Sequence, residues 1–285
     1  MRNLDISFET TAGVVNAVRG VNLTVNRGET VAIVGESGSG KSVSAKAIMG
    51  ILAKNGTIDR GQITFSYYRN PEERVTREIL QMKKEEIRRH INGKRIAMVF
   101  QDPMTSLNPL MPVGKQIMEG MIWHYHTPKE EAYEKALELM KLVGITDAEK
   151  RIKTIRTSSP VVCARESSLR SHWRAIRNFL ICDEPTTALD VTIQSKILEL
   201  IQEIQKKRQL SVIYITHDLG VVAKVADYVN VMYAGKIVET ARSRMYSTIR
   251  ATRTHGDFSP RCQIWEQTTN VFTQSRAARQ TCFTR

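Results

Sequence analysis

The sequence lacks a long apolar run: no stretch of its 285 residues approaches about 18 uninterrupted apolar residues, so we expect no membrane-spanning helix. The first ten residues carry an acid and no apolar run, unlike a secretory signal, and this favours a cytosolic protein. The four cysteines have no framework spacing, which agrees with a reducing compartment. The sequence also has no internal repeat, and no cluster of acids or histidines offers a separate transition-metal site.

The composition excludes a mostly disordered or collagen-like chain. Hydrophobic residues make up 41% and charged residues 25%, with a mean hydropathy of -0.29. A chain of this length can bury the core of one large α/β domain, or of a core domain with an appendage.

The net charge of +13 invites a nucleic-acid interpretation, but the charge is unevenly placed. Residues 154–178 hold five arginines and one acid, and residues 241–285 hold eight arginines and two acids. The other 215 residues carry only +3. The two basic segments contain 13 arginines and no lysine, whereas the remainder has 17 lysines and 12 arginines. The main body is therefore nearly neutral, and the two segments differ from it in composition.

Apolar runs and turn residues alternate along the chain in the manner of an α/β protein. A strand over 30–34 precedes a glycine cluster and a helix over 42–51, and residues 72–91 form a charged helical pattern. Further strands are expected at 4–8, 21–25, 96–100, 179–182, 211–215, 228–233 and 236–239. Helices are expected at about 114–125, 128–143, 192–207 and from 219. The helices between 103 and 178 indicate a helical subdomain inserted into the sheet domain.

A phosphate-binding loop follows the strand at 30–34. Its residues match GxxxxGK[ST] at every fixed position: Gly35, Glu36, Ser37, Gly38, Ser39, Gly40, Lys41 and Ser42. Glycines let backbone N–H groups point at phosphate oxygens, and the helix N-terminus adds partial positive charge. We expect Lys41 to reach the β and γ phosphates and the Ser42 hydroxyl to ligate Mg²⁺. The alternative, a glycine turn with an incidental lysine, explains less of this strand–loop–helix setting.

A second apolar strand, 179–182, ends in two acids, which places Asp183 at the carboxyl edge of the sheet. There Asp183 can hold Mg²⁺ and Glu184 can orient the attacking water. The alternative is that both acids cap a helix begun by Pro185, which would leave the metal without this partner.

In this order, GESGSGKS, VFQDP at 99–103, CDEPTTALD at 182–190 and ITHD at 215–218 resemble the ATP-binding subunit of an ABC transporter. FQDPMTSLNP and DEPTTALDVT resemble in particular peptide importers, with nickel importers as close relatives. The resemblance covers residues 1 to about 240. It implies an α/β phosphate-loop NTPase fold, the ABC-type nucleotide-binding domain, with an antiparallel β subdomain and an inserted helical subdomain.

The resemblance also implies site roles. Gln101 matches the glutamine that touches Mg²⁺ and water, and His217 the histidine that contacts the γ-phosphate, although a histidine after a strand is often structural. Asp190 matches a loop that communicates across the dimer. Phe8 is a candidate to stack on adenine, but a strand phenylalanine equally fits a core.

ATP and Mg²⁺ are the implied cofactors. The implied partners are two transmembrane permeases, a second ATP-binding subunit in a head-to-tail dimer, and an extracytoplasmic peptide-binding protein reached through the permeases. The implied location is the cytoplasmic face of the membrane, as a peripheral protein. The cargo stays open among dipeptide, oligopeptide and nickel.

One family motif is missing. Members carry an LSGGQ-like signature before the second acidic motif, but here residues 153–166 read KTIRTSSPVVCARE, with no glycine. Reading one base earlier from Ser159 permits FSGGMRQRVVIAIALACNP, and the same exercise from Ala241 permits GTVADVFYDPRHPYTWGLL. We therefore interpret 154–178 as a compensated frameshift and 241–285 as an uncompensated, truncated one. The alternative is a divergent segment with a basic tail.

The predicted function is thus an ATPase that drives peptide import, with weak or absent hydrolysis as written. Two other classes stay open. A DNA-repair or chromosome-organising ATPase shares the phosphate site, but no coiled-coil or zinc insert is present and the near-neutral body does not favour nucleic acid. A catalytically dead or regulatory ATP-binding subunit fits the missing signature.

Overall fold

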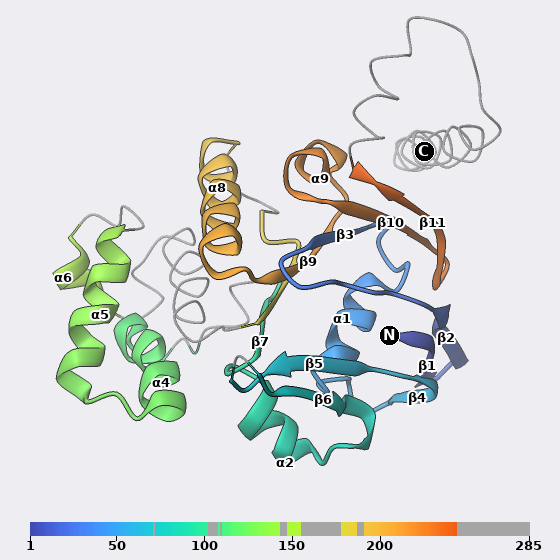
Figure 1. The fold of residues 1–285 in the computed structure, drawn as a ribbon, viewed down its shortest axis with the longest axis horizontal. Helices are drawn as coiled ribbons and strands as arrows, with labels where there is room; N and C mark the ends of the chain where they lie inside the picture. The colour runs from blue at the N-terminus through green and yellow to red at the C-terminus, as the bar shows by residue number, and fades with distance from the viewer. Residues whose placement is uncertain are drawn as a thin grey trace, which may run out of the picture.

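A six-stranded sheet forms the centre of the molecule (Figure 1). The structure is a computed structural model that describes residues 1–70, 72–101, 108, 110–142, 147–154, 178–186 and 191–243. From edge to edge the strands are β11 (Lys236–Arg242), β10 (Tyr228–Tyr233), β3 (Thr30–Val34), β9 (Ser211–Thr216), β8 (Phe179–Asp183) and β7 (Ile96–Val99). All neighbours run parallel except β11, which is antiparallel to β10.

Several strands of this sheet, including the edge strand β7, are mainly apolar, which fits a sheet covered on both faces. Every residue of β3, β7 and β9 is buried. Ile213 and Ile215 of β9 belong to one core cluster, whereas Val212 and Tyr214 belong to a second cluster. This alternation gives each face of the sheet its own core.

Helices cover one face and a mixed layer covers the other (Figure 1). Helix α8 (Val191–Arg208) and helix α9 (Leu219–Val225) lie on one side, and α8 contributes Ile197, Leu198 and Ile201 to the second core. Helix α1 (Lys41–Ile48) lies on the other side, where Ala47 and Ile48 enter the first core.

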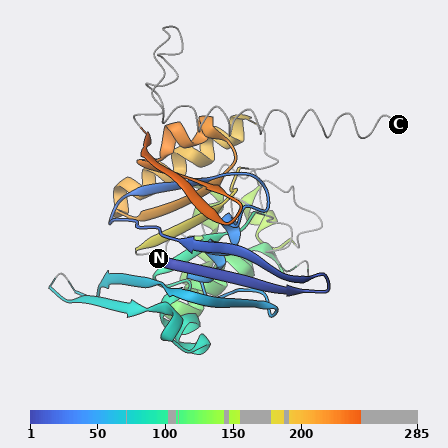
Figure 2. The ribbon, with the colours of Figure 1, turned by 90° about the vertical axis from the view of Figure 1, so that its right-hand side faces the viewer.

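The second layer is an antiparallel sheet in the order β2–β1–β4, which lies beside the β10–β11 hairpin (Figure 2). Its strands are β1 (Arg2–Thr10), β2 (Gly13–Val21) and β4 (Gly56–Gln62). A hairpin of β5 (Thr64–Tyr68) and β6 (Arg74–Glu78) follows it. Leu4 and Ile6 of β1 are fully buried in the first core, so this layer packs against the central sheet through α1 and its own apolar residues.

Three helices form a separate unit to one side of the sheet: α4 (Val113–Tyr125), α5 (Lys129–Leu142) and α6 (Ala148–Arg151) (Figure 1). They share a core of their own that includes Ile117, Ala136 and Ile152. The Gly114 N–H donates to the Ile152 carbonyl at 3.0 Å, which ties α4 to the residue after α6. These helices occupy the described part of the expected helical subdomain, 103–178.

Two expectations for secondary structure were wrong. Residues 72–91 do not form one helix: β6 occupies 74–78, where Val75 pairs with Tyr67 of β5, and only short helical turns at 79–81, 84–86 and 87–91 follow. Strand pairing overrides the helix preference of charged residues here, since that preference is weak. The strand expected at 21–25 is not formed: β2 ends at Val21, and the buried Leu23 exchanges backbone hydrogen bonds with Met1, at 3.1 and 2.7 Å.

Strand β11 continues to Arg242, two residues past 240, where the resemblance was expected to end. The remaining expected strands and helices have counterparts that differ by a few residues at their ends. Strands β2, β4 and β5 were not expected, because strands with few buried residues carry little apolar pattern.

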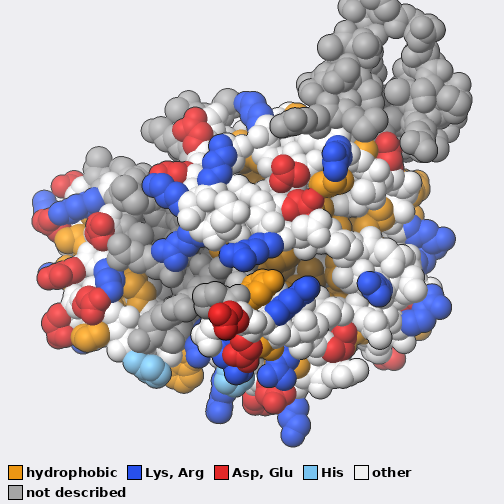
Figure 3. All heavy atoms as spheres, viewed as in Figure 1, with side chains coloured by type: hydrophobic (Ala, Val, Ile, Leu, Met, Phe, Trp, Pro, Cys, Tyr) orange, Lys and Arg blue, Asp and Glu red, His pale blue; other side chains and the backbone are white. Residues whose placement is uncertain are grey.

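The described surface mixes charges of both signs. On the face drawn in Figure 3, acidic and basic side chains are interspersed over the central domain and the helical unit. Within the described residues, no helix is both long and apolar enough to cross a membrane.

Because the sheet is packed on both faces, shortening a central side chain should destabilise the whole domain. We expect Ile213→Ala, at a side chain 1% exposed, to lower the free energy of unfolding by about 2–5 kcal/mol. Val238→Ala, at a β11 residue 46% exposed, is the control and should change it by less than about 0.5 kcal/mol. Urea unfolding followed by circular dichroism measures both, and equal midpoints for the two variants would contradict the two-sided core.

Candidate functional site

The register of three parallel strands brings the predicted site residues together. Val34 of β3 pairs with Thr216 of β9, and Asp183 of β8 pairs with Ile215 of β9, so the three strands end at one edge. The phosphate loop follows β3, Glu184 follows β8 and His217 follows β9. The site is therefore built at the carboxyl edge of the sheet, where open α/β sheets place their ligands.

The phosphate loop requires glycine at two tight places. A Cβ on Gly35 would lie 2.0 Å from the carbonyl oxygen of Met232 in β10. Gly40 has a φ of 101° and caps α1, and a Cβ there would lie 2.5 Å from the Ala17 carbonyl oxygen of β2. The loop is thus seated directly on two neighbouring strands, and only glycine permits this approach.

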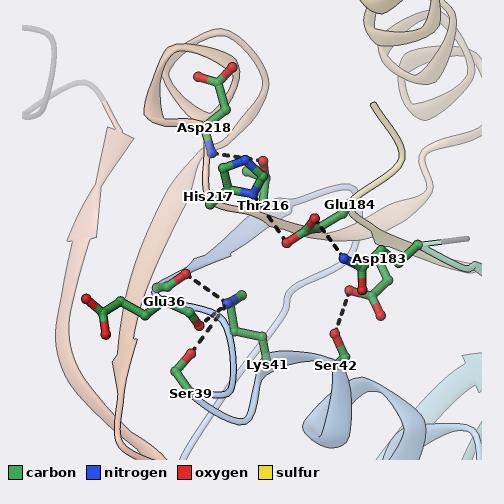
Figure 4. Close-up of polar contacts among 11 residues, drawn as sticks. Glu36, Ser39, Lys41, Ser42, Asp183, Glu184, Thr216, His217 and Asp218 are labelled. Atoms are coloured by element: carbon green, nitrogen blue, oxygen red, sulfur yellow. Dashed lines mark hydrogen bonds and ion pairs between the residues drawn. The ribbon is translucent and has the colours of Figure 1, made fainter. Parts of the chain in front are cut away.

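Lys41 lies inside the loop (Figure 4). Its side chain is buried, and its Nζ donates to the carbonyl oxygens of Gly35 at 2.8 Å and Glu36 at 2.6 Å. Burial lowers the pKa of the Lys41 ammonium, while the nearby carboxylates of Glu184, Asp183 and Glu36 oppose that shift. The three donors of a lysine ammonium can turn from these carbonyls to phosphate oxygens, which are stronger acceptors.

Ser42 and Asp183 form the second part of the site. The Ser42 hydroxyl, at the start of α1, donates to Asp183 Oδ1 at 2.8 Å (Figure 4). Asp183 is 2% exposed, and this burial raises the pKa of its carboxyl, which the Ser42 hydrogen bond partly offsets. A hydroxyl and a carboxylate are hard oxygen ligands of the kind that Mg²⁺ prefers, so the two residues fit the expected metal.

Glu184 contacts both of the other predicted catalytic residues. Gln101 Nε2 donates to Glu184 Oε2 at 3.1 Å, and His217 Nδ1 lies 3.3 Å from Glu184 Oε1. The backbone of Glu184 has a φ of 47°, and its N–H donates to the Ile215 carbonyl at 2.9 Å. The left-handed backbone turns the side chain away from the strand and toward these partners, a strain typical of functional positions.

Two residues near the site were not predicted to act there. Thr216 is buried and its hydroxyl accepts from the Asp218 N–H at 3.0 Å, while Asp218 Oδ1 caps α9 by accepting from the Gly220 N–H at 2.8 Å and the Val221 N–H at 3.3 Å. They hold the turn that carries His217 (Figure 4). An aspartate directly before the first residue of a helix is a capping signal, and it could have indicated this role.

Phe8 lies in β1, between Val15 of β2 and Gly56 of β4. A Cβ on Gly56 would lie 2.6 Å from the ring, so the ring covers that residue, and it also packs against the first core. Stacking of Phe8 on adenine stays a prediction. Asp190 and the stretch 155–177, where the signature is expected, lie outside the described residues.

Replacing Asp183 with asparagine should stabilise the metal-free protein at neutral pH. An amide can still accept the Ser42 hydrogen bond, but it carries no buried charge. Because the folded-state pKa of Asp183 is raised, its ionised form destabilises the fold above that pKa, and the cost fades as the pH falls toward 3.8. The stability difference between Asp183→Asn and the wild type should therefore shrink as the pH falls, measured by urea unfolding with a chelator from about pH 8 to about pH 4.

Asp59→Asn is the matched control. Asp59 also accepts from a serine hydroxyl, that of Ser7 at 2.9 Å, but it is exposed. We expect a much smaller stability change there at neutral pH. A difference for Asp183→Asn that stays constant or grows with acidification would contradict the buried-charge account.

The chain resembles known proteins over most of its length. A family model described as ABC transporter matches residues 18–187. The chain is 48% identical over 241 residues to the oligopeptide transport ATP-binding protein OppD of Bacillus subtilis (strain 168), covering 84% of this chain and 64% of that protein. It is 46% identical over 240 residues to the dipeptide transport ATP-binding protein DppD of Lactococcus lactis subsp. cremoris (strain MG1363), covering 84% of this chain and 66% of that protein. The chain thus spans just under two thirds of the length of these relatives.

A solved structure gives the same fold. The dimeric ATP-binding cassette MJ0796, in a post-hydrolysis state bound to ADP and Pi, matches with a TM-score of 0.72 and 21% identity, covering 85% of this chain and 97% of that chain. The expected α/β fold, with its antiparallel β layer and helical unit, is confirmed. Together with the family match and the close relatives, this shows that the chain belongs to the ABC transporter family.

Proposed function

We propose that this chain binds ATP with Mg²⁺ and is the ATP-binding subunit of a peptide importer. The observation that supports this most is the meeting of three elements at one sheet edge. These are a glycine loop around Lys41, the Ser42–Asp183 pair, and Glu184 between Gln101 and His217. Curated relatives with 46–48% identity are named as oligopeptide and dipeptide transport proteins, which supports the peptide cargo.

The residues divide the work of phosphoryl transfer between them. The loop amides and Lys41 would hold the phosphates of ATP, and Ser42 and Asp183 would hold Mg²⁺. When bound, Mg²⁺ supplies charge that neutralises the phosphate oxygens as the bond to the γ-phosphate breaks. Glu184 would orient and polarise the attacking water, with Gln101 and His217 fixing the direction of its carboxylate.

The proposed assembly follows the family. Two ATP-binding subunits would close head to tail on two ATP molecules and drive two transmembrane permeases fed by an extracytoplasmic peptide-binding protein. The chain would then act as a peripheral protein at the cytoplasmic face of the membrane. Uptake of dipeptide, oligopeptide and nickel, compared between a strain lacking the operon and its intact parent, would identify the cargo among these three.

We further propose that 154–178 and 241–285 are read out of frame. Their arginine enrichment, lack of lysine and share of three of the four cysteines are then by-products of misreading. When the gene is read one base earlier from Ser159, the resulting sequence has a pair of glycines at the place where the family's signature contacts the ATP of the partner subunit. Resequencing the gene is the direct test, and a trace that confirms the present frame through both stretches would defeat the proposal.

The chain as written should bind ATP at its own phosphate loop but hydrolyse it weakly or not at all. Restoring FSGGMRQR and its flanking frame should recover hydrolysis, because the signature completes the partner's site. Phosphate release by the two versions, each with its partner subunit, checks this. Equal and measurable ATPase rates for both versions would refute it. A turnover of zero in both would favour the catalytically dead or regulatory subunit, and failure to co-purify with permeases would favour a DNA-linked ATPase.

In the restored protein, Glu184→Gln should lower the hydrolysis rate by about 10²–10⁴-fold while ATP binding persists. Glutamine keeps the size of the side chain and can still contact Gln101 and His217, but it cannot accept a proton from water. Single-turnover hydrolysis and equilibrium binding of MgATP separate the two effects. Glu73→Gln, at an exposed carboxylate paired with Arg69, is the control and should leave both unchanged.

A further inference from the structure

The phosphate loop is joined to a turn that comes near the end of the described chain. Tyr233 ends β10 and Lys236 begins β11, and Ala234 and Gly235 connect them. The Gly235 N–H donates to the carbonyl oxygen of Ser39, in the phosphate loop, at 3.0 Å. This hydrogen bond links the loop to a hairpin turn almost 200 residues away in sequence.

The turn is held in a conformation that favours glycine. Ala234 has a φ of 46° and Gly235 a φ of 82°, the pair of left-handed residues typical of a two-residue hairpin turn. Asparagine or glycine usually occupies the first of these positions, and alanine carries a steric cost there. The turn therefore depends on contacts from outside the hairpin to keep its shape.

Arg19 of β2 supplies such contacts. Its backbone N–H donates to the Gly235 carbonyl at 2.7 Å, and its guanidinium donates to the Ala234 carbonyl through Nε at 3.0 Å and also through Nη2. Two guanidinium donors on one carbonyl fix both the distance and the direction of the turn. The backbone of β2 also lies against both the phosphate loop and the turn, because the Ala17 carbonyl lies close to Gly40 and to Gly235.

We propose that Arg19 is a positioning residue for the phosphate loop. It clamps the Ala234–Gly235 turn, the turn fixes the Ser39 carbonyl, and the loop thereby keeps the shape that receives phosphate. The proposal rests on the proposed function, because its consequence for affinity requires that the loop bind nucleotide. It assigns the antiparallel layer a role in nucleotide affinity that does not involve contact with the nucleotide.

A second arginine allows a matched control. Arg19, Arg60 and Lys236 line one cavity of about 660 Å³ between the antiparallel sheet and the β10–β11 hairpin. Arg60 pairs with Asp5 at 2.8 Å and its side chain is 71% exposed. Replacing Arg60 removes a positive charge from the same cavity while it leaves the contacts of the turn in place.

The experiment compares Arg19→Ala, Arg19→Lys and Arg60→Ala with the wild type, in the full chain. MgATP affinity is measured by equilibrium titration, and the exchange of the Gly235 amide hydrogen by NMR without nucleotide. We expect both Arg19 variants to bind MgATP about three- to tenfold more weakly, since losing one charge-assisted contact of this kind has that order of effect. Lysine keeps the charge but not the fork, so it should not rescue. Arg60→Ala should match the wild type.

Several outcomes would overturn the proposal. Wild-type affinity in Arg19→Lys would show that long-range charge, and not the clamp, is what matters. An equal loss in Arg60→Ala would show the same. If the Gly235 amide exchanges no faster in the Arg19 variants than in the wild type, the clamp is excluded. The clamp is also excluded if all amides exchange faster and the unfolding midpoint falls, because the substitution then destabilises the whole domain. If the wild type binds no MgATP, the proposed function fails, and the amide measurement still decides whether the clamp exists.

Discussion

The parallel register of β3, β9 and β8 is the constraint on which the site depends. It places the ends of three strands, and thus the residues after Val34, Asp183 and Thr216, at one edge of the sheet. Ser42 and Asp183, which are separated by about half of the chain, then meet within hydrogen-bond distance, and so do Glu184 and His217. A slip of one residue in any strand would move Asp183 or its neighbours to the other face and dissolve the site.

Two charged groups at this edge of the sheet, Lys41 and Asp183, are buried at a cost in free energy. Burial lowers the pKa of Lys41 and raises the pKa of Asp183, so each charged form is less stable there than in water. These buried charges therefore destabilise the folded domain, and the packing of the sheet must offset that loss of stability. Strands β3, β7 and β9 are buried along their whole length, and the core that they form stabilises the domain enough to keep Lys41 and Asp183 in place.

The sequence predicted the parallel strands and the phosphate site best, because apolar runs that end in Gly35 or Asp183 carry both signals together. It predicted the antiparallel layer poorly. Strands β4 and β5 have few buried residues. The charged sequence of β6 favoured a helix, but in the structure Val75 of β6 pairs with Tyr67 of β5. The contact of Arg19 with Ala234 could not be predicted for a different reason. Its acceptor is a backbone carbonyl, and every residue has one, so such a hydrogen bond leaves no pattern in the sequence.

Within the described residues, the contacts that shape the phosphate loop come from positions before 241. Ala17 and Met232 lie against the loop, and the Ala234–Gly235 turn, which Arg19 contacts, donates to the Ser39 carbonyl. A change of reading frame from Ala241 would begin near the end of β11, at a position in the chain that follows all of these residues. A change over 154–178 would fall instead where the family's signature serves the partner's ATP. If both stretches are misread, the loop and the signature are therefore affected unequally: under the proposed function, nucleotide binding would depend on the intact part of the chain, whereas hydrolysis in the pair would also require the altered part.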